Sequence, residues 1–227
     1  MKKIGDTLVY DDLEEMINPS HTALIVVDLQ NDFCHPEGHF ARHGKDLTMI
    51  EERLPAMCAF VREVQSLGVR TVFTLQTTLA NGKSDPPAWL RFKCRDGKSP
   101  DYTLHGSWGW ELVDGLEPGS RDLVVEKFRP DSFVQTNLDL LLRANAVETV
   151  VIMGVITEGC VESTVRAASY RDYYTVVVQD GVASPNALLH EGSMRLFEAR
   201  YPLHGMAEIL EVWRRSAQAR SGQAAAG

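Results

Sequence analysis

A cysteine that follows a strand-like segment is the residue in this sequence best suited to act as a nucleophile. The apolar stretch that begins at residue 150 leads into a turn with two glycines, Gly154 and Gly159, and an amphipathic helix is expected to begin close to Cys160. Backbone N–H groups and the positive end of a helix dipole both lower the pKa of a thiol and favour the thiolate. An isolated cysteine more often only packs, so other residues must decide between the two roles.

Two charged residues stand at the ends of other expected strands. Asp28 follows the apolar residues 22–27, and Lys127 follows residues 122–126. Because the carboxyl ends of parallel strands meet at one edge of a sheet, an acid, a base and the thiol of Cys160 are expected at the same edge. Alone, the aspartate could cap a turn and the lysine could be a solvated charge. Together with the cysteine they favour a catalytic site.

Alternating strands and helices are expected to position these residues. This pattern predicts an α/β fold of three layers (α/β/α, Rossmann-like), with a mainly parallel sheet of about six strands and helices on both faces. Residues 206–212 are expected to form a short final strand or a helical turn. Strands are predicted at 22–27, 69–75, 122–126, 148–154 and 174–179, and helices at 47–67, 137–144, 160–171 and 186–200.

The 227 residues are enough for one sizeable domain, predicted at residues 21–213. Residues 1–20 are predicted to form an extended N-terminal arm. Residues 214–227, rich in Ala, Gly, Ser and Gln, are predicted to form a flexible tail. The long connection at 76–120 carries most of the tryptophans, and connections of this length are usually functional, for example as binding walls. A polar loop rich in Gly and His is expected at 31–45.

Composition argues against several classes of function. The net charge is −8 and no basic stripe is present, so a nucleic-acid partner is not expected. No apolar run approaches the length of a membrane span, and the first residues do not resemble a signal peptide. The four cysteines form neither a CxxC pair nor a disulfide-framework spacing. Reduced thiols and a cytoplasmic location are therefore predicted.

Three sequence motifs resemble those of the isochorismatase-like cysteine hydrolases. VVDLQNDF at residues 26–33 is similar to the opening motif of that family, VEKFRPDSF at 125–133 to its lysine motif, and GVITEGCV at 154–161 to its nucleophile motif. The motifs stand in the order and spacing of the family, and the resemblance extends from residue 20 to residue 212. It implies that residues 21–213 form an isochorismatase-like hydrolase domain.

The resemblance implies a metal-independent cysteine amidohydrolase, a hydrolase acting on C–N bonds other than peptide bonds. Such an enzyme cleaves a small linear amide, ureide or carbamoyl compound through a thioester and releases ammonia. The Thr-x-Gly-Cys-Val form of the nucleophile motif is similar to N-carbamoylsarcosine amidases. The segment Gly106-Ser107-Trp108, with residues 112–114 after it, is instead similar to ureidoacrylate hydrolases. The substrate therefore stays open.

The resemblance also implies a role for each catalytic residue. Cys160 attacks the carbonyl carbon, Asp28 takes the thiol proton and returns it to the leaving nitrogen, and Lys127 stabilises the thiolate. The backbone N–H groups of Ile156 and Cys160 are the candidates for the oxyanion hole. A cis peptide bond is expected between Val155 and Ile156. Because relatives usually carry a smaller residue than Ile156, its side chain is expected to narrow the pocket.

Six further residues near the strand ends are candidates for binding the substrate. Two phenylalanines are expected to line the cavity, and three amide side chains could hydrogen-bond an amide or a ureide. An arginine in the lysine motif could bind a substrate carboxylate, although a surface role is equally open. Glu158 is interpreted differently, as a carboxylate at a helix N-terminus that the dipole favours. The six candidates are Gln30, Asn31, Phe33, Gln76, Arg129 and Phe133.

Metal, cofactor and nucleotide sites are not predicted. His35, His39 and His43 recur at a spacing that a helix would align, but Pro36 and Gly38 favour a loop, and no fourth ligand accompanies them. Nicotinamidases of this family bind a metal through an Asp-x-His motif after the second strand, where this chain has Gln-Thr-Thr. The glycines before the cysteine lack the Lys-Ser/Thr pair of a phosphate loop.

Alternatives to the amidohydrolase interpretation stay open. An isochorismatase-type enzyme would cleave a vinyl ether without needing the thiol. A non-catalytic member of the fold is a second alternative, although it would have no need for all three residues. A thiol redox sensor is a third, weakened because no resolving cysteine lies nearby in sequence. The expected partners are a small amide or ureide substrate and further copies of the chain in a homo-oligomer, either a dimer or a tetramer; neither nucleic acid nor membrane is expected.

Overall fold

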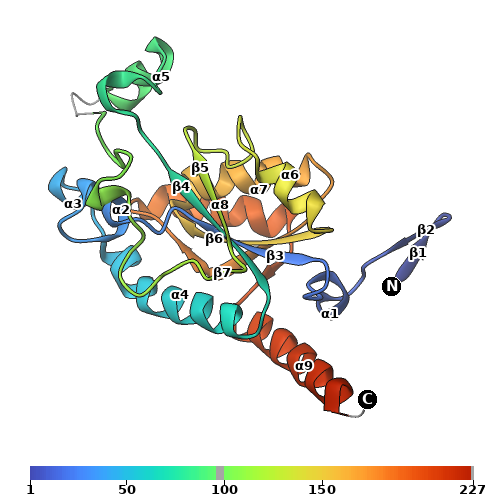
Figure 1. The fold of residues 1–227 in the computed structure, drawn as a ribbon. Helices are drawn as coiled ribbons and strands as arrows, with labels where there is room; N and C mark the ends of the chain where they lie inside the picture. Colours follow the sequence, from blue (N-terminus) through green and yellow to red (C-terminus); the bar gives the residue numbers. More distant parts are fainter. Residues whose placement is uncertain (96–99, 226–227) are drawn as a thin grey trace.

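A six-stranded sheet forms the centre of the molecule. The structure is a computed structural model and describes residues 1–95 and 100–225. The strand order is β5-β4-β3-β6-β7-β8, and each neighbouring pair is parallel (Figure 1). The strands are β3 (Thr22–Val27), β4 (Arg70–Gln76), β5 (Leu123–Lys127), β6 (Thr149–Val155), β7 (Tyr174–Ala183) and β8 (Leu203–His204).

Helices cover both faces of this sheet. Two long helices, α4 and α9, pack on one face, and α6, α7 and α8 pack on the other (Figure 1). This arrangement confirms the predicted three-layer α/β/α fold. The bounds are α4 (Thr48–Ser66), α6 (Leu138–Ala144), α7 (Glu162–Ser169), α8 (Ala187–Arg200) and α9 (Met206–Ala225).

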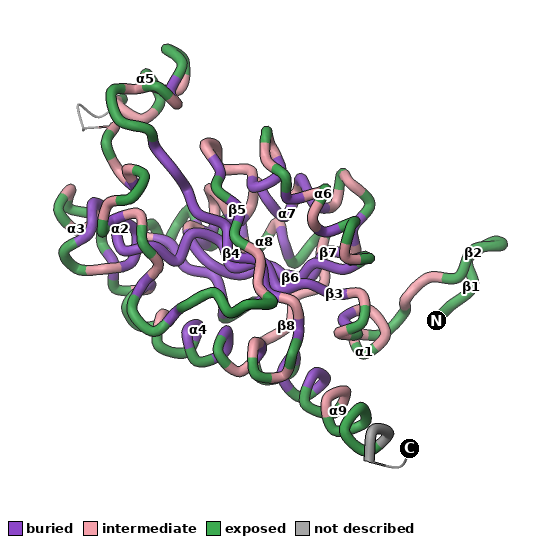
Figure 2. Tube along the Cα trace, viewed as in Figure 1, coloured by how far each residue is buried: buried purple, intermediate pink, exposed green. Residues whose placement is uncertain are grey.

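The central strand β3 shows why its sequence reads as a continuous apolar run. Leu24 and Val26 face the core that α4 and α9 cover, whereas Ala23 and Ile25 face the opposite core. All six residues of β3 are buried, and Figure 2 shows the burial concentrated along the sheet. A parallel strand covered on both faces has no solvent side, so it needs apolar residues at every position.

The connections beyond the carboxyl ends of β3 and β4 contain short elements that the sequence did not predict. Two short helices, α2 and α3, occupy the expected loop at 31–45, and α5 lies within the long connection after β4 (Figure 1). A π-helical turn, η3, leads from β6 into α7. The bounds are α2 (Asn31–Cys34), α3 (His39–Arg42), η1 (Ala80–Gly82), α5 (Pro87–Lys93), η2 (Trp108–Trp110) and η3 (Thr157–Val161).

The N-terminal arm lies outside the central sheet. The N-terminal arm contains a hairpin of β1 (Lys2–Ile4) and β2 (Thr7–Val9), followed by α1 (Leu13–Met16). Its hairpin extends away from the sheet and is largely exposed (Figures 1 and 2).

Among residues 1–95 and 100–225, no helix has both the length and the apolar character needed to cross a membrane.

The C-terminal segment is helical, which agrees with the helical alternative predicted for residues 206–212, and the helix continues further than predicted. Residues 206–212 begin the helix α9, which continues through most of the predicted flexible tail to Ala225. Trp213 is fully buried and donates a hydrogen bond to the carbonyl oxygen of Ile17 at 2.7 Å. Arg214 forms an ion pair with Glu63 of α4. These contacts hold the first half of the helix against the rest of the protein, and the alanine-rich sequence after them has a high helix propensity.

Gly154 of β6 provides a test of how closely the backbones of β3 and β6 approach each other. Its φ is +125°, and a Cβ atom there would lie 2.1 Å from the carbonyl oxygen of Val27. We predict that Gly154→Ala lowers the free energy of unfolding by about 2–3 kcal/mol in urea denaturation, through overpacking. Gly192→Ala is the matched control, since nothing lies within 4 Å of its Cβ position in α8. It should be neutral or slightly stabilising, and equal stability of both variants would contradict the close approach.

Candidate active site

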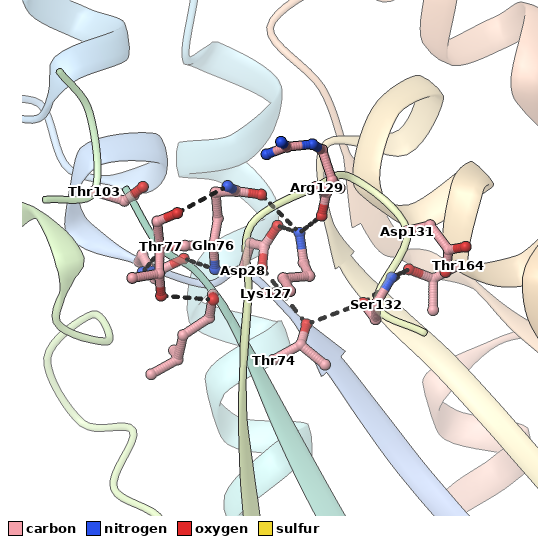
Figure 3. Close-up of polar contacts among 12 residues, drawn as sticks. Asp28, Thr74, Gln76, Thr77, Thr103, Lys127, Arg129, Asp131, Ser132 and Thr164 are labelled. Atoms are coloured by element: carbon pink, nitrogen blue, oxygen red, sulfur yellow. Dashed lines mark hydrogen bonds and ion pairs between the residues drawn. The ribbon is translucent and has the colours of Figure 1, made fainter. Parts of the chain in front are cut away.

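A buried ion pair lies at the carboxyl edge of the sheet. Lys127 is the last residue of β5 and Asp28 directly follows β3, with Nζ 2.7 Å from Oδ2 (Figure 3). Both side chains are 0% exposed. An unpaired charge at this depth would be strongly unfavourable, so each of the two residues depends on the presence of the other.

Backbone and side-chain groups of β4 hold the pair in place. Asp28 has a φ of +51°, and its Oδ1 accepts a hydrogen bond from the backbone N–H of Gln76 at 3.0 Å. The ammonium of Lys127 also donates to Gln76 Oε1 at 3.1 Å and to the carbonyl oxygen of Arg129 at 3.2 Å (Figure 3). An ammonium has three donors. With Asp28 as the third partner, the orientation of Lys127 is fixed.

Cys160 completes a cluster of three groups. It lies in η3 and is half-buried, and its thiol is electrostatically coupled to both Asp28 and Lys127. The structure therefore brings together the acid, the base and the thiol that the sequence predicts at one edge of the sheet. Asp28 and Lys127 come from the ends of β3 and β5, and Cys160 comes from the turn that follows β6.

A cavity of about 300 Å³ opens beside the Cys160 thiol. This size suits a small organic molecule. Aromatic side chains from the segments around α2, α3 and α5 form one part of the wall, and the turn before α7 forms another. The lining includes Phe33, His39, Phe40, His43, Lys45, Gln76, Trp89, Phe92, Lys93, Arg95, Tyr102, Pro130, Ile156, Glu158, Cys160 and Leu189.

Burial governs the protonation of the three grouped residues. It raises the pKa of the Cys160 thiol to about 12, although Lys127 lowers that pKa. Burial also raises the pKa of Asp28, again against the lowering effect of Lys127. Burial would lower the pKa of Lys127, but Asp28 and Cys160 raise it above its ordinary value. The sequence-based expectation of a lowered thiol pKa is thereby corrected, because desolvation outweighs the favourable charge of Lys127.

Two of the six predicted substrate-binding residues, Phe33 and Gln76, line the cavity. Two others bind backbone groups of the protein instead. Gln30 donates to the carbonyl oxygens of Gln76 and Trp110, and Asn31 donates to that of Trp108. Both amides are buried and lie outside the cavity wall. They satisfy buried carbonyl groups and fix the loop around η2, which corrects their predicted role.

The other two predicted residues also lie outside the cavity lining. Phe133 is 4% exposed and packs in the core covered by α6, α7 and α8. The guanidinium of Arg129 donates to the carbonyl oxygen of Ser84 at 3.2 Å and lies over the ring of Trp89. Its backbone carbonyl, rather than its charge, reaches Lys127. Arg129 therefore braces the wall of the site, which corrects its predicted role as a carboxylate ligand.

Several residues of the cavity wall were not identified from the sequence. The side chain of Lys93 is fully buried, pairs with Asp85 at 2.9 Å and lies over the ring of Tyr102. It belongs to the long connection whose length indicated function, but nothing in the pattern singled it out. The basic residues Lys45 and Arg95 lie in the same wall.

The histidines of the 31–45 segment are also placed differently from a metal site. His39 and His43 line the cavity with their rings stacked at 3.9 Å. Burial, and next the charge of His43, lower the pKa of His39 to about 4. Within residues 1–95 and 100–225, no group of three His, Cys, Asp or Glu side chains is arranged to hold a metal ion. The metal-free interpretation stays a prediction.

The turn before Cys160 accommodates the large side chain of Ile156. The peptide bond between Val155 and Ile156 is cis, as the family resemblance implies. Ile156 lines the cavity, and a Cβ atom on Gly159 would come 2.9 Å from its Cγ1 atom. Gly159 therefore leaves the space that this isoleucine occupies. The role of the Ile156 and Cys160 N–H groups as an oxyanion hole stays a prediction.

Comparison with known proteins identifies the class of protein. The family model described as Isochorismatase domain matches residues 22–210. The chain is 31% identical over 189 residues to the ureidoacrylate amidohydrolase RutB of Methylorubrum extorquens. The matched region covers 78% of this chain and 76% of that protein. It is 32% identical to the RutB protein of Methylobacterium radiotolerans over 184 residues, 76% of this chain and 71% of that one.

Solved structures share the fold of this chain. A cysteine hydrolase from Pseudomonas syringae has a TM-score of 0.75 at 22% identity, over 94% of this chain and 100% of that one. An N-carbamoylsarcosine amidase from Thermoplasma acidophilum has a TM-score of 0.62 at 27% identity, over 82% and 96% of the two chains. The chain belongs to the isochorismatase family, and it is a hydrolase of that family.

The raised pKa of the thiol leads to a prediction about its reactivity. Below the folded pKa of about 12 the thiol keeps its proton, so the thiolate fraction increases with pH throughout the neutral and mildly alkaline range. We predict that alkylation of Cys160 by iodoacetamide, followed by peptide mass spectrometry, accelerates from pH 7 to beyond pH 10 without a plateau. Alkylation of Cys94, which is also half-buried, is followed in the same sample as a control for loss of the reagent.

The same alkylation experiment on Asp28→Asn shows in which direction Asp28 shifts the pKa of the Cys160 thiol. Asp28 raises the pKa of the thiol, so its removal should shift the alkylation profile of Cys160 to lower pH. A plateau near pH 7 in the wild-type protein would contradict a protonated resting thiol.

Proposed function

We propose that the chain is a cysteine amidohydrolase that cleaves the C–N bond of a small linear amide, ureide or carbamoyl compound. The observation that carries this proposal is the position of the Cys160 thiol in the wall of a small cavity, electrostatically coupled to a fully buried Asp28–Lys127 ion pair. The names of its relatives, a ureidoacrylate amidohydrolase and an N-carbamoylsarcosine amidase, support the same class of bond.

In the first step the sulfur of Cys160 attacks the carbonyl carbon of the substrate while Asp28 accepts the thiol proton. A thiol needs such a base, because little of it is ionised at neutral pH. The raised pKa of Asp28 makes its carboxylate a stronger base than a solvated one, which reduces the energetic cost of the transfer. Lys127 keeps its positive charge and stabilises the sulfur as it loses the proton.

In the second step Asp28 returns the proton to the leaving nitrogen. The C–N bond breaks, ammonia departs and a thioester remains on Cys160. Asp28 then takes a proton from water, the resulting hydroxide attacks the thioester, and the C–S bond breaks as the sulfur regains a proton. The N–H groups of Ile156 and Cys160 are proposed to stabilise both tetrahedral oxyanions. Every proton transfer is assigned to Asp28, so the mechanism calls for no metal ion.

The charge of the cavity wall favours a substrate that also carries a carboxylate. Lys45 and Arg95 place basic side chains in the lining, whereas the charge of Lys93 is balanced by its ion pair with Asp85. Positive charge near a binding site attracts anionic ligands and disfavours cationic ones. An acidic ureide or amide therefore fits the cavity better than a positively charged one. Assembly into a homo-oligomer and a cytoplasmic location stay predictions from the sequence.

The proposal predicts the activity of two cysteine variants. Cys160→Ala should lower ammonia release from the best substrate in a panel of amides and ureides by at least about a thousandfold, since the nucleophile is lost. Cys94→Ala is the control, because Cys94 lies outside the cavity lining, and it should keep wild-type activity. Undiminished hydrolysis by Cys160→Ala would contradict the thioester mechanism and favour thiol-independent chemistry such as vinyl ether cleavage.

A further inference from the structure

A buried hydrogen bond ties the turn that carries Cys160 to a helix elsewhere in the chain. The hydroxyl of Thr157, the first residue of η3, lies 2.8 Å from Nδ1 of His190 in α8. Both residues are buried. Neither belongs to the lining of the cavity beside the thiol, so neither is placed to touch a substrate there. The bond therefore acts on the turn and not on the ligand.

The start of this turn lacks the side-chain cap that many helices have. η3 is a π-helical turn, a rare form that occurs mostly as a single turn and is frequent at functional sites. Ile156 stands at the N-cap position and makes no side-chain cap hydrogen bond. The anchorage comes instead from the first two residues of the turn. Thr157 is held by His190, and Glu158 is held by the hydroxyl of Ser184 at 2.9 Å.

His190 keeps one protonation state across the neutral pH range. Burial, and next the charge of Arg53, lower the pKa of its imidazole. The ring is therefore neutral at pH 7, with one nitrogen as a donor and the other as an acceptor. A buried hydroxyl and a buried ring nitrogen that lose each other leave two unsatisfied polar groups, which is costly. The bond between Thr157 and His190 is therefore expected to persist in the folded protein.

We propose that His190 is a positioning residue, which through its hydrogen bond to Thr157 holds the Ile156 N–H and the Cys160 sulfur in the geometry needed for catalysis. This inference rests on the proposed function. Thr157 directly follows Ile156 and stands three residues before Cys160, so a displacement of Thr157 moves both groups. Misplacing a catalytic group by about 1 Å costs on the order of a hundredfold in rate. The threonine of the Thr-x-Gly-Cys-Val motif thereby gains a role.

Two substitutions of Thr157 separate its hydroxyl from its shape. Thr157→Val keeps the branched shape and removes the hydroxyl, whereas Thr157→Ser keeps the hydroxyl. We expect Thr157→Val to lower kcat for the best substrate of the amide and ureide panel by about tenfold to a hundredfold. KM should stay within about threefold, because Thr157 lies outside the cavity lining. Thr157→Ser should keep at least about a third of the wild-type kcat. Equal losses of kcat in the two variants would overturn the inference.

Variants of His190 test whether the two residues act as a pair. His190→Leu should reproduce the loss of kcat seen in Thr157→Val. His190→Asn, whose amide offers a polar atom near the position of Nδ1, should be at least about fivefold faster than His190→Leu. The double variant Thr157→Val/His190→Leu should be no slower than the slower single variant, since one bond is lost only once. Losses that multiply in the double variant would overturn the inference.

Thr175→Val is the matched control for a general loss of stability. Thr175 of β7 is also buried and lies outside the cavity lining, and its hydroxyl donates to the carbonyl oxygen of Tyr173 at 3.0 Å. Thr175→Val should lower the midpoint of urea unfolding about as much as Thr157→Val does, but it should leave kcat unchanged. A loss of kcat in Thr175→Val as large as that in Thr157→Val would overturn the inference.

Alkylation of Cys160 by iodoacetamide keeps this inference distinct from the proposed function, because it needs no hydrolysis. Burial raises the pKa of the thiol, so a turn released from His190 should expose the sulfur. We expect alkylation at pH 8 to be at least about threefold faster in Thr157→Val and unchanged in Thr157→Ser. A rate that does not rise in Thr157→Val would overturn the inference. A faster rate in Thr157→Val, with no hydrolysis of any panel member by the wild-type protein, would contradict only the proposed function.

Discussion

The ion pair between Asp28 and Lys127 is the interaction on which the rest of the site depends. Asp28 directly follows β3 and Lys127 ends β5, and β4 separates these two strands in the sheet. Gln76 at the end of β4 bridges them, with its backbone N–H on Asp28 and its side chain on Lys127. Burying two charges costs several kcal/mol for each ion and is offset only in good geometry. The register of three strands must therefore be kept for the pair to persist.

The burial that makes the ion pair costly also sets the chemistry of the thiol. Desolvation raises the pKa of Cys160 and of Asp28 together, so the thiol rests protonated beside a base stronger than a solvated carboxylate. Lys127 limits both shifts by its positive charge. A solvated version of the same three residues would be easier to fold but would offer a weaker base. Stability and reactivity at this site thus depend on the same lack of water.

Much of this arrangement could be predicted from the sequence, because strand ends follow simple rules. The bounds of β3 are as predicted, and Asp28, Lys127 and Cys160 meet because parallel strands place their carboxyl ends at one edge. The direction of a side chain does not follow from its position near that edge. Gln30 turns to backbone carbonyls and Phe133 to the core, since buried carbonyls and apolar surface compete with the cavity for them.

A double-mutant cycle on Asp28→Asn and Lys127→Met, measured by the free energy of unfolding in urea, tests the central claim most directly. Each single variant leaves one buried polar group without its partner, at a cost of about 3–5 kcal/mol where a charge is left unpaired. The double variant removes both charges, so its cost should be smaller than the sum of the single costs by at least about 2 kcal/mol. Additive costs within about 0.5 kcal/mol would show that the two charges do not support each other and would contradict the account.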